Sequence, residues 1–165
     1  MVDHGGTPEE VQQLWISVRD GGLRGTCLVQ ERSPGGDETV CSASADVDRN
    51  GVVTLLAAAR VLLEDQTPSG LGIPVSMATD FLPEILEPVQ KFLESVPYHG
   101  FANFDIKIDP RDSTPCFFEV NPRIGRNNYY VTAAGANISR FVVEDCLQDQ
   151  DVSTETVHRQ VLYTA

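Results

Sequence analysis

The chain has 165 residues, and its 41% of hydrophobic residues is ordinary for a globular protein and argues against disorder. A formal net charge of −12 at pH 7 argues against a nucleic-acid or an anionic-membrane partner. No apolar run approaches the roughly 18 residues of a membrane span, and the start of the chain shows no signal peptide, so we expect a cytoplasmic protein.

The first half of the chain predicts one helix followed by strands. The helix begins at Thr7, where Thr-Pro-Glu-Glu supplies an N-cap, a proline at the first helical position and a glutamate three residues on, and it ends at Gly21. A strand is expected over residues 26–33. Two further strands, 39–47 and 52–63, flank Asp-Arg-Asn-Gly, and Asn-Gly is a strong hairpin signal.

The second half predicts a loop, a hairpin, helices and a last strand. Residues 64–79 are rich in Pro, Gly and Ser and indicate a loop, and residues 80–96 follow as an amphipathic helix. Beyond the hairpin we expect helices over 129–136 and 138–147 and a strand over 156–163. This order of elements predicts an α+β domain in which helices pack on an antiparallel sheet.

The cysteines show no Cys-x-x-Cys spacing, and the histidines form no cluster along the sequence. The four cysteines are far apart, and most fall in apolar or strand-like stretches. We therefore expect reduced, buried thiols rather than metal ligands. They are Cys27, Cys41, Cys116 and Cys146.

An acidic hairpin is the most informative segment. Residues 101–108 and 116–121 predict two strands, and the run Asp-Pro-Arg-Asp-Ser between them predicts a tight turn. Because side chains alternate along a strand, one face of the hairpin is apolar and belongs to the core. The expected core residues are Phe104, Ile106, Ile108, Phe118 and Val120.

The other face of this hairpin carries two polar pairs. A turn centred on Asp112 places Asp105 opposite Glu119 and Asn103 opposite Asn121. Directly opposed carboxylates repel, whereas a bound cation reverses the sign of their interaction. Carboxylate and amide oxygens suit Mg²⁺, with nucleotide phosphates as further ligands. The alternative is a solvated acidic face without a metal.

Two arginines follow the second strand, at the start of the helix expected over 129–136. Arginine binds phosphate or carboxylate with paired hydrogen bonds, and a helix N-terminus favours anions. Arg123 and Arg126 therefore predict an anion site beside the metal site, an arrangement that suits ATP chemistry on a carboxylate. The alternative is that both arginines only neutralise nearby acids.

These motifs resemble a known superfamily. Phe-Asp-Ile-Lys at 104–107 and Phe-Glu-Val-Asn-Pro-Arg at 118–123 resemble the metal-binding end of ATP-grasp enzymes. The run that begins Gly-Arg-Asn-Asn-Tyr-Tyr, at 125–135, is similar to carboxylate–amine ligases of the D-aspartate ligase type, which are themselves similar to carbamoyl-phosphate synthase large subunits. Residues 28–38 resemble the strand and turn that hold adenine and ribose, and 61–72 resemble a loop of the same ligases.

The resemblance implies a role for each matching residue. For residues 28–38, the alternative to an adenine-binding strand is an ordinary edge strand with a Pro-Gly-Gly turn. Glu38 is the alternative to Asp37 as the residue that binds the ribose hydroxyls. The metal ligands would be Asp105, Glu119 and Asn121, with Arg123 on the transferred phosphate and Arg126, Asn127 and Asn128 on the substrate carboxylate. The nucleotide contacts would be Gln30 and Glu31 at adenine N6, the backbone of Arg32 and Ser33, and Asp37 at the ribose.

The resemblance also implies a domain plan. Residues 1–25 would be the remnant of a preceding subdomain, and 26–165 would form the C-terminal, metal-binding subdomain of an ATP-grasp fold. The only lysines are Lys91 and Lys107, and neither lies in a Gly-rich loop before residue 28. We therefore expect a fragment that lacks the N-terminal ATP-grasp subdomain and is inactive alone.

The function implied for the whole protein is that of an ATP-dependent carboxylate–amine ligase. Such an enzyme forms an acyl phosphate and joins it to an amine, here on an amino acid or a peptide. The expected cofactors are ATP and Mg²⁺ or Mn²⁺, the expected partners are small carboxylate and amine substrates, and oligomerisation is left open. The alternatives are a carbamoyl-phosphate synthase-like reaction and a non-catalytic Mg-nucleotide-binding module.

Overall fold

The computed structural model describes residues 5–67, 70 and 72–164. The chain divides into two compact units, one that ends at Arg32 and one that begins at Ser33. The domain boundary expected at residue 26 stays a prediction. In the described part of the chain, no helix is both long enough and apolar enough to cross a membrane.

The first unit contains helix α1, Pro8–Asp20, where the sequence predicts it. The Thr7 hydroxyl accepts a hydrogen bond from the Glu10 amide at 3.2 Å, which satisfies one of the free amides of the first turn. At the other end, the Gly21 amide donates to the Ser17 carbonyl at 2.9 Å. Both expected ends of the helix are therefore confirmed.

The strand expected over residues 26–33 does not form, and this prediction is wrong. Residues 26–32 are exposed, and the first strand of the described structure begins only at Val40. A strand exists only where a neighbour pairs its backbone groups, and a favourable sequence does not supply that neighbour.

The second unit is built on one sheet with the strand order β5-β4-β1-β2-β3-β7, and β6 pairs with β2 beside this path. The β6–β2 pairing is parallel, and the others are antiparallel. The expected α+β class and antiparallel sheet are thus confirmed. The strands are β1 (Val40–Val47), β2 (Val53–Glu64), β3 (Pro74–Asp80), β4 (Gly100–Ile108), β5 (Pro115–Asn121), β6 (Glu155–Thr156) and β7 (Leu162–Thr164).

The turn between β1 and β2 follows the Asn-Gly signal. Asp48 Oδ1 accepts hydrogen bonds from the amides of Asn50 at 2.9 Å and Val52 at 2.8 Å. Gly51 has a φ of 81°, a left-handed conformation that glycine adopts without steric cost. The hairpin predicted here is confirmed.

Strand β3 lies almost entirely within the segment expected to be a loop, and that prediction is wrong for residues 74–79. Pro74 stands at the first strand position, where its missing N–H group is tolerated. Met77 and Thr79 are buried within the sheet, at 0% and 1% exposure. Of the ligase-like loop motif before β3, residues Pro68, Ser69 and Leu71 lie outside the described residues.

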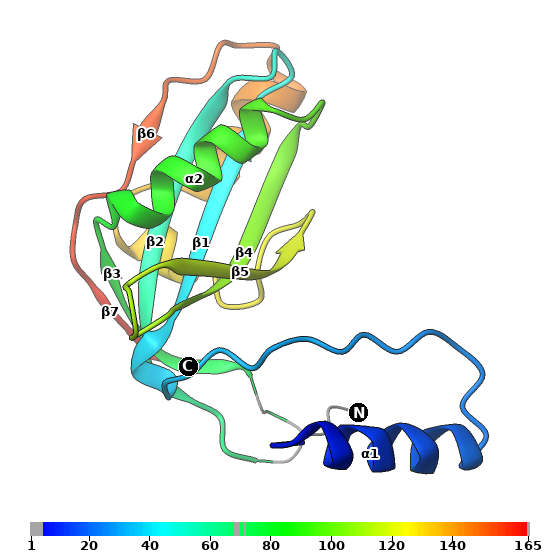
Figure 1. Ribbon diagram of the computed structural model, residues 1–165. Helices are drawn as coiled ribbons and strands as arrows, with labels where there is room; N and C mark the ends of the chain where they lie inside the picture. Colours follow the sequence, from blue (N-terminus) through cyan, green and yellow to red (C-terminus); the bar gives the residue numbers. More distant parts are fainter. Residues whose placement is uncertain (1–4, 68–69, 71, 165) are drawn as a thin grey trace. The chain divides into compact units, whose positions relative to one another are not determined.

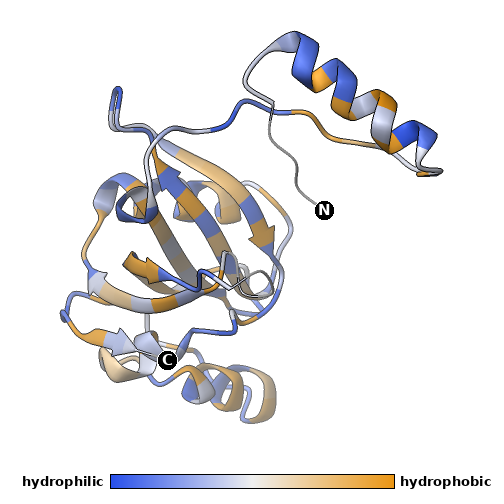
Figure 2. Cartoon of the chain, turned by 90° about the horizontal axis from the view of Figure 1, so that it is seen from below, coloured by the Kyte–Doolittle hydropathy of each residue, from blue (hydrophilic) through white to orange (hydrophobic). Residues whose placement is uncertain are grey.

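Helix α2, Pro83–Glu94, confirms the amphipathic helix but begins later than expected, because Pro83 takes the first helical position. The helix lies across one face of the sheet (Figure 1). Its inward side chains pack with apolar residues of β1, β2 and β4. Figure 2 shows hydrophobic and hydrophilic residues interspersed along the strands of the sheet. The buried residues of α2 are Ile85, Leu86, Val89 and Leu93.

Short helices cover the other face of the sheet (Figure 1). They are α3 (Tyr129–Ala133) and α4 (Ile138–Val142), followed by η2, a π-helix over Val143–Leu147. The helix expected over 129–136 therefore ends early, because Gly135 takes a φ of 118° and its amide closes the last turn on the Thr132 carbonyl at 3.0 Å. The second core lies here and includes Leu55, Ala57, Tyr130, Phe141 and Val157.

The remaining sequence predictions are partly confirmed. The last strand, expected over 156–163, is replaced by the two short strands β6 and β7. All four cysteines are free thiols, but only Cys41 is buried. Cys27 and Cys146 are exposed and Cys116 is half-buried, so the expectation of buried thiols is wrong for these three.

Candidate metal and nucleotide site

The β4–β5 hairpin has the predicted register. Asp105 lies opposite Glu119, and Asn103 lies opposite Asn121. The two carboxylates therefore face each other across neighbouring strands, as the turn length requires. This pairing is the centre of the candidate site.

A bulge directly after Asp105 changes the apolar face of β5. Ile106 pairs with Phe117, so Phe118 has no partner of its own in the ladder. Phe118 and Val120 are 49% and 39% exposed, and the expectation that they belong to the core is wrong. Phe117 instead contacts the ring of Phe104 edge-to-face, with ring centroids 6.0 Å apart. The strand β5 also lies at the edge of the sheet, where less of its surface is covered.

The carboxylate of Asp105 is held by two amides. Asn103 Nδ2 donates to its Oδ1 at 3.4 Å, and Asn121 Nδ2 donates to its Oδ2 at 3.5 Å. Burial raises the pKa of Asp105, and the negative charge of Glu119 raises it further, whereas Arg123 opposes the rise. The ionised pair is therefore unfavourable without a cation, and it stands where a cation would be stabilised.

The Asn103 side chain that donates to Asp105 belongs to a buried polar network. Asn103 is only 5% exposed, and its Oδ1 lies 3.5 Å from Ser42 Oγ and 3.4 Å from Ser44 Oγ, which can both donate to it. The Ser44 hydroxyl also contacts the Tyr130 hydroxyl at 3.0 Å. Burial raises the pKa of Tyr130 to about 12, so its hydroxyl stays protonated. The alternation Ser-Ala-Ser in an apolar strand is the signal by which these serines could have been found.

The loop after β5 packs closely on this network. A Cβ atom added to Gly125 would lie 2.5 Å from Asn103 Oδ1, so only glycine fits there. Arg123 Nη2 donates to Asn121 Oδ1 at 3.3 Å, and its Nη1 donates to the Ile124 carbonyl at 3.1 Å. Asn121 thereby links Arg123 to Asp105. The structure thus brings Arg123 to the carboxylate pair.

The other predicted anion ligands lie differently. Arg126 is exposed on the same loop. Asn127 directs its Nδ2 at the sulfur of Met77, 2.8 Å away, and the Asn128 carbonyl accepts from the Val131 amide at 3.0 Å. Helix α3 is five residues long and has no side-chain cap, so its N-terminus offers little of the field that was expected to favour an anion.

The turn expected to hold the ribose lies on the same sheet. Asp37 begins the 3₁₀ helix η1, Asp37–Thr39, and its Oδ2 accepts from the Glu64 amide at 3.1 Å. The carboxylate of Glu38 accepts from the Gly36 amide at 2.9 Å, a bond that lowers the pKa of Glu38. Asp37 is therefore fixed to β2, whereas Glu38 bonds within its own turn.

The adenine contacts predicted for Gln30, Glu31 and Arg32 stay predictions, because these residues belong to the first unit, where they are exposed. Ser33 belongs to the second unit and is half-buried. Its carbonyl accepts a hydrogen bond from the Lys107 ammonium at 3.1 Å. Sequence reasoning assigned no role to Lys107.

Electrostatics connect the turn with the carboxylate pair. Burial raises the pKa of Glu64, and the charges of Asp37 and Asp105 raise it further, whereas Lys107 lowers it. These four groups therefore share one environment. The turn expected to hold the ribose and the expected metal ligands lie on one face of the second unit.

The donors of this face fit Mg²⁺. Among the described residues, no group of three or more His, Cys, Asp or Glu side chains could enclose a metal ion. Mg²⁺ does not require such a cage, because it is usually bound by one or two carboxylates together with phosphate oxygens and water. The Asp105–Glu119 pair with the Asn121 amide is a donor set of this open kind.

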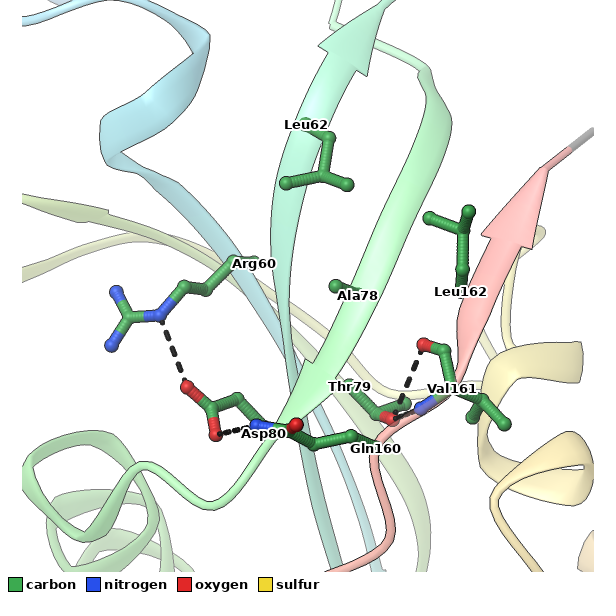
Figure 3. Close-up of a pocket in the computed structure, with 8 residues that line it drawn as sticks. All are labelled: Arg60, Leu62, Ala78, Thr79, Asp80, Gln160, Val161 and Leu162. Carbon is green, nitrogen blue, oxygen red and sulfur yellow. Dashed lines mark hydrogen bonds and ion pairs between the residues drawn. The ribbon is translucent and has the colours of Figure 1, made fainter.

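A hollow lies elsewhere on the sheet, between β2, β3 and the segment that leads into β7 (Figure 3). Asp80 lies within hydrogen-bond distance of Arg60 Nε at 3.3 Å and of Gln160 Nε2 at 3.2 Å. Thr79 accepts from the Val161 amide at 2.7 Å. Because these polar groups satisfy one another, the hollow does not point to a ligand.

Comparisons with known proteins bear on the family and the fold of the chain. No protein-family model matches the chain. The chain is 38% identical to D-aspartate ligase of Enterococcus faecium (strain Aus0004) over 139 residues, which are 84% of this chain and 33% of that protein. It thus spans about a third of the length of this relative.

Solved structures share the fold at low sequence identity. One is the biotin carboxylase domain of Hydrogenobacter thermophilus 2-oxoglutarate carboxylase, solved in complex with MgADP, ADP and bicarbonate. It matches with a TM-score of 0.52 and 12% sequence identity, and the match covers 70% of this chain and 26% of that chain. Another is N5-carboxyaminoimidazole synthase of Aspergillus clavatus, solved in complex with ADP and 5-aminoimidazole ribonucleotide. It matches with a TM-score of 0.54 and 11% sequence identity, and the match covers 76% of this chain and 34% of that chain.

The fold of the chain is that of an ATP-grasp subdomain. Within that class, its sequence is similar to D-aspartate ligase. The likeness to ligases of this type, which the hairpin and loop motifs predict, is therefore confirmed.

Proposed function

We propose that this chain forms the metal- and nucleotide-binding part of an ATP-dependent carboxylate–amine ligase that acts on an amino acid or a peptide. The observation that carries the proposal is the opposition of Asp105 and Glu119 on a face that also holds Arg123 and the Asp37 turn. The similarity to D-aspartate ligase supports the same class of reaction.

Each residue of the site has a defined task in this proposal. Asp105, Glu119 and Asn121 hold Mg²⁺, which neutralises phosphate charge when it is bound. Asp37 uses the carboxylate oxygen that does not bond to β2 to accept from the ribose hydroxyls. The backbone of Arg32 and Ser33 and the side chains of Gln30 and Glu31 contact adenine.

The proposed reaction has two steps. An oxygen of the substrate carboxylate attacks the γ-phosphorus of ATP, and ADP leaves. The amine then attacks the acyl carbon, inorganic phosphate leaves, and the amine nitrogen gives up a proton to that phosphate. Arg123 stabilises the negative charge on the transferred group, because its guanidinium lies beside the carboxylate pair. Arg126, with Asn127 and Asn128, orients the substrate carboxylate, and its exposure leaves it accessible.

A calorimetric titration of the chain with ADP tests this role. Mg²⁺ should tighten ADP binding about tenfold in the wild type, because Asp105 and Glu119 would hold a cation that offsets the charge of the phosphates. The double variant Asp105→Asn, Glu119→Gln should bind ADP equally with and without Mg²⁺. Asp112→Asn, an exposed acid in the turn of the same hairpin, serves as the matched control. A failure to bind ADP, or an equal effect of Mg²⁺ in all variants, would contradict the proposal.

A further inference from the structure

The side chain of Lys107 reaches from β4, the strand next to the edge strand β5, to the turn around Gly35, which lies more than seventy residues earlier in the chain. Its ammonium donates to the Ser33 carbonyl at 3.1 Å and to the Gly35 carbonyl at 2.7 Å. Lys107 lies in β4, two residues after Asp105 and on the same side of the strand. One strand therefore carries both a proposed metal ligand and the cation that contacts the proposed nucleotide turn.

The turn itself is built for one conformation. Gly35 has a φ of 93°, and a Cβ atom there would lie 2.5 Å from Thr39 Cγ2, so only glycine fits. The Gly36 carbonyl accepts from the Thr39 amide at 3.1 Å and from the Thr39 hydroxyl at 2.7 Å. These local bonds fix the shape of the turn but not its position on the sheet.

Two longer contacts set that position. Asp37 accepts from the amide of Glu64, which attaches the turn to β2. Lys107 attaches it to β4. Backbone carbonyls at Ser33 and Gly35 cannot bond to each other, and Lys107 is the sheet residue that donates to both. A lysine is long enough to supply it, and its charge makes each bond stronger than one between neutral groups.

The charge of Lys107 also balances its surroundings. It lowers the pKa of Glu64 and the pKa of Glu38, although burial and backbone hydrogen bonds respectively are the larger influences. Because Asp37, Glu64 and Asp105 also lie on this face, removal of the ammonium would leave their negative charges less compensated. The turn would then keep its bond to β2 but lose its bonds to β4, next to carboxylates that repel one another.

We infer that Lys107 is a positioning residue that holds the turn Ser33–Asp37 at a fixed separation from the carboxylates of the β4–β5 hairpin. The ribose end and the phosphate end of one nucleotide can then be bound together. This inference rests on the proposed function for its nucleotide part. The contact between Lys107 and the turn is independent of it.

The test compares Lys107→Met, Lys107→Arg and the control Lys91→Met. Methionine keeps the apolar stem without the donor, and arginine keeps a cationic donor. Lys91 is the other lysine of the chain and lies exposed on α2, with 77% of its side chain accessible. Amide hydrogen exchange over residues 33–39 reports on the turn, ADP titration with Mg²⁺ reports on the nucleotide, and a melting curve checks the fold.

Lys107→Met should speed exchange of the Gly36 and Thr39 amides about tenfold and weaken MgADP binding by about the same factor, since a charged hydrogen bond is lost. Lys107→Arg should keep most of the exchange protection and most of the MgADP affinity of the wild type. Lys91→Met should match the wild type in both measurements. Unchanged exchange in Lys107→Met would overturn the inferred contact. Faster exchange with unchanged MgADP affinity would overturn the positioning role. If the wild type binds no ADP, the proposed function fails, and exchange alone decides the contact.

Discussion

The two faces of strands β1 and β4 differ sharply although the same backbone forms both. On the face under α2, Ala43 and Ala45 of β1 lie beside Phe104 and Ile106 of β4 in an apolar core. Residues one position away carry hydroxyls, amides and a carboxylate. These residues are Ser42, Ser44, Asn103 and Asp105, and the first three are at most 5% exposed.

Burial alone would favour apolar residues on both faces, so the polar face needs a separate explanation. Burying a polar group costs free energy unless it is hydrogen-bonded, whereas burying an apolar side chain is favourable. The polar face meets this requirement, because no buried side-chain nitrogen or oxygen of the described residues lacks a partner. An apolar face would satisfy the packing with less difficulty, so we interpret the polar face as part of the binding site.

The largest effect is expected on the apolar face. Phe104 is 1% exposed and contacts the rings of Phe92 and Phe117 edge-to-face. Phe104→Ala should lower the free energy of unfolding by about 3–5 kcal/mol, because it removes a buried ring and leaves a cavity. Urea unfolding followed by circular dichroism measures this change. A loss below about 1 kcal/mol would mean that this face is less tightly packed than the structure indicates.

A smaller effect is expected for the neighbouring polar residue. Asn103→Ala should lower the free energy of unfolding by about 1–3 kcal/mol, because Ser42 and Ser44 lose their acceptor and Asp105 loses a donor. The same urea experiment applies, with Gln90→Ala, an exposed amide on α2, as the control. If the two variants were equally stable, the buried network would contribute nothing to the fold.

The contrast between the faces was partly visible in the sequence. The opposition of Asp105 and Glu119 follows from turn length and side-chain alternation, and both signals are local. The bulge after Asp105 is not local, since it depends on where Phe117 finds a contact with Phe104. The exposed positions of Phe118 and Val120 were therefore missed.

Other features depended on partners remote in sequence. Strand β3 carries a proline and weak alternation, and it forms because β2 and β7 flank it. The role of Lys107 was missed because its partners are backbone carbonyls, which leave no side-chain pattern. Residues 26–33 show the opposite case. Their sequence favours a strand, but none forms there, because no strand among the described residues pairs with them.

The smallest change in the free energy of unfolding is expected for a substitution of Asp105. It should stabilise the protein, whereas Phe104→Ala and Asn103→Ala should destabilise it. The folded-state pKa of Asp105 is raised, so the folded protein binds this proton more tightly than the unfolded chain does. The free energy of unfolding therefore falls as pH rises from the unfolded pKa through the folded one. Asp105→Asn should remove this loss and stabilise the metal-free protein near pH 7 by roughly 0.5–1 kcal/mol, with little difference near pH 3.

Comparing the free energy of unfolding of the wild type and Asp105→Asn near pH 7, with and without millimolar Mg²⁺, tests the central claim most directly. Without Mg²⁺ the variant should be the more stable protein. With Mg²⁺ the wild type should gain stability and the variant should not, because the cation binds the folded carboxylate pair. Equal gains in both proteins, or a variant less stable than the wild type without metal, would contradict a cation site at the Asp105–Glu119 pair.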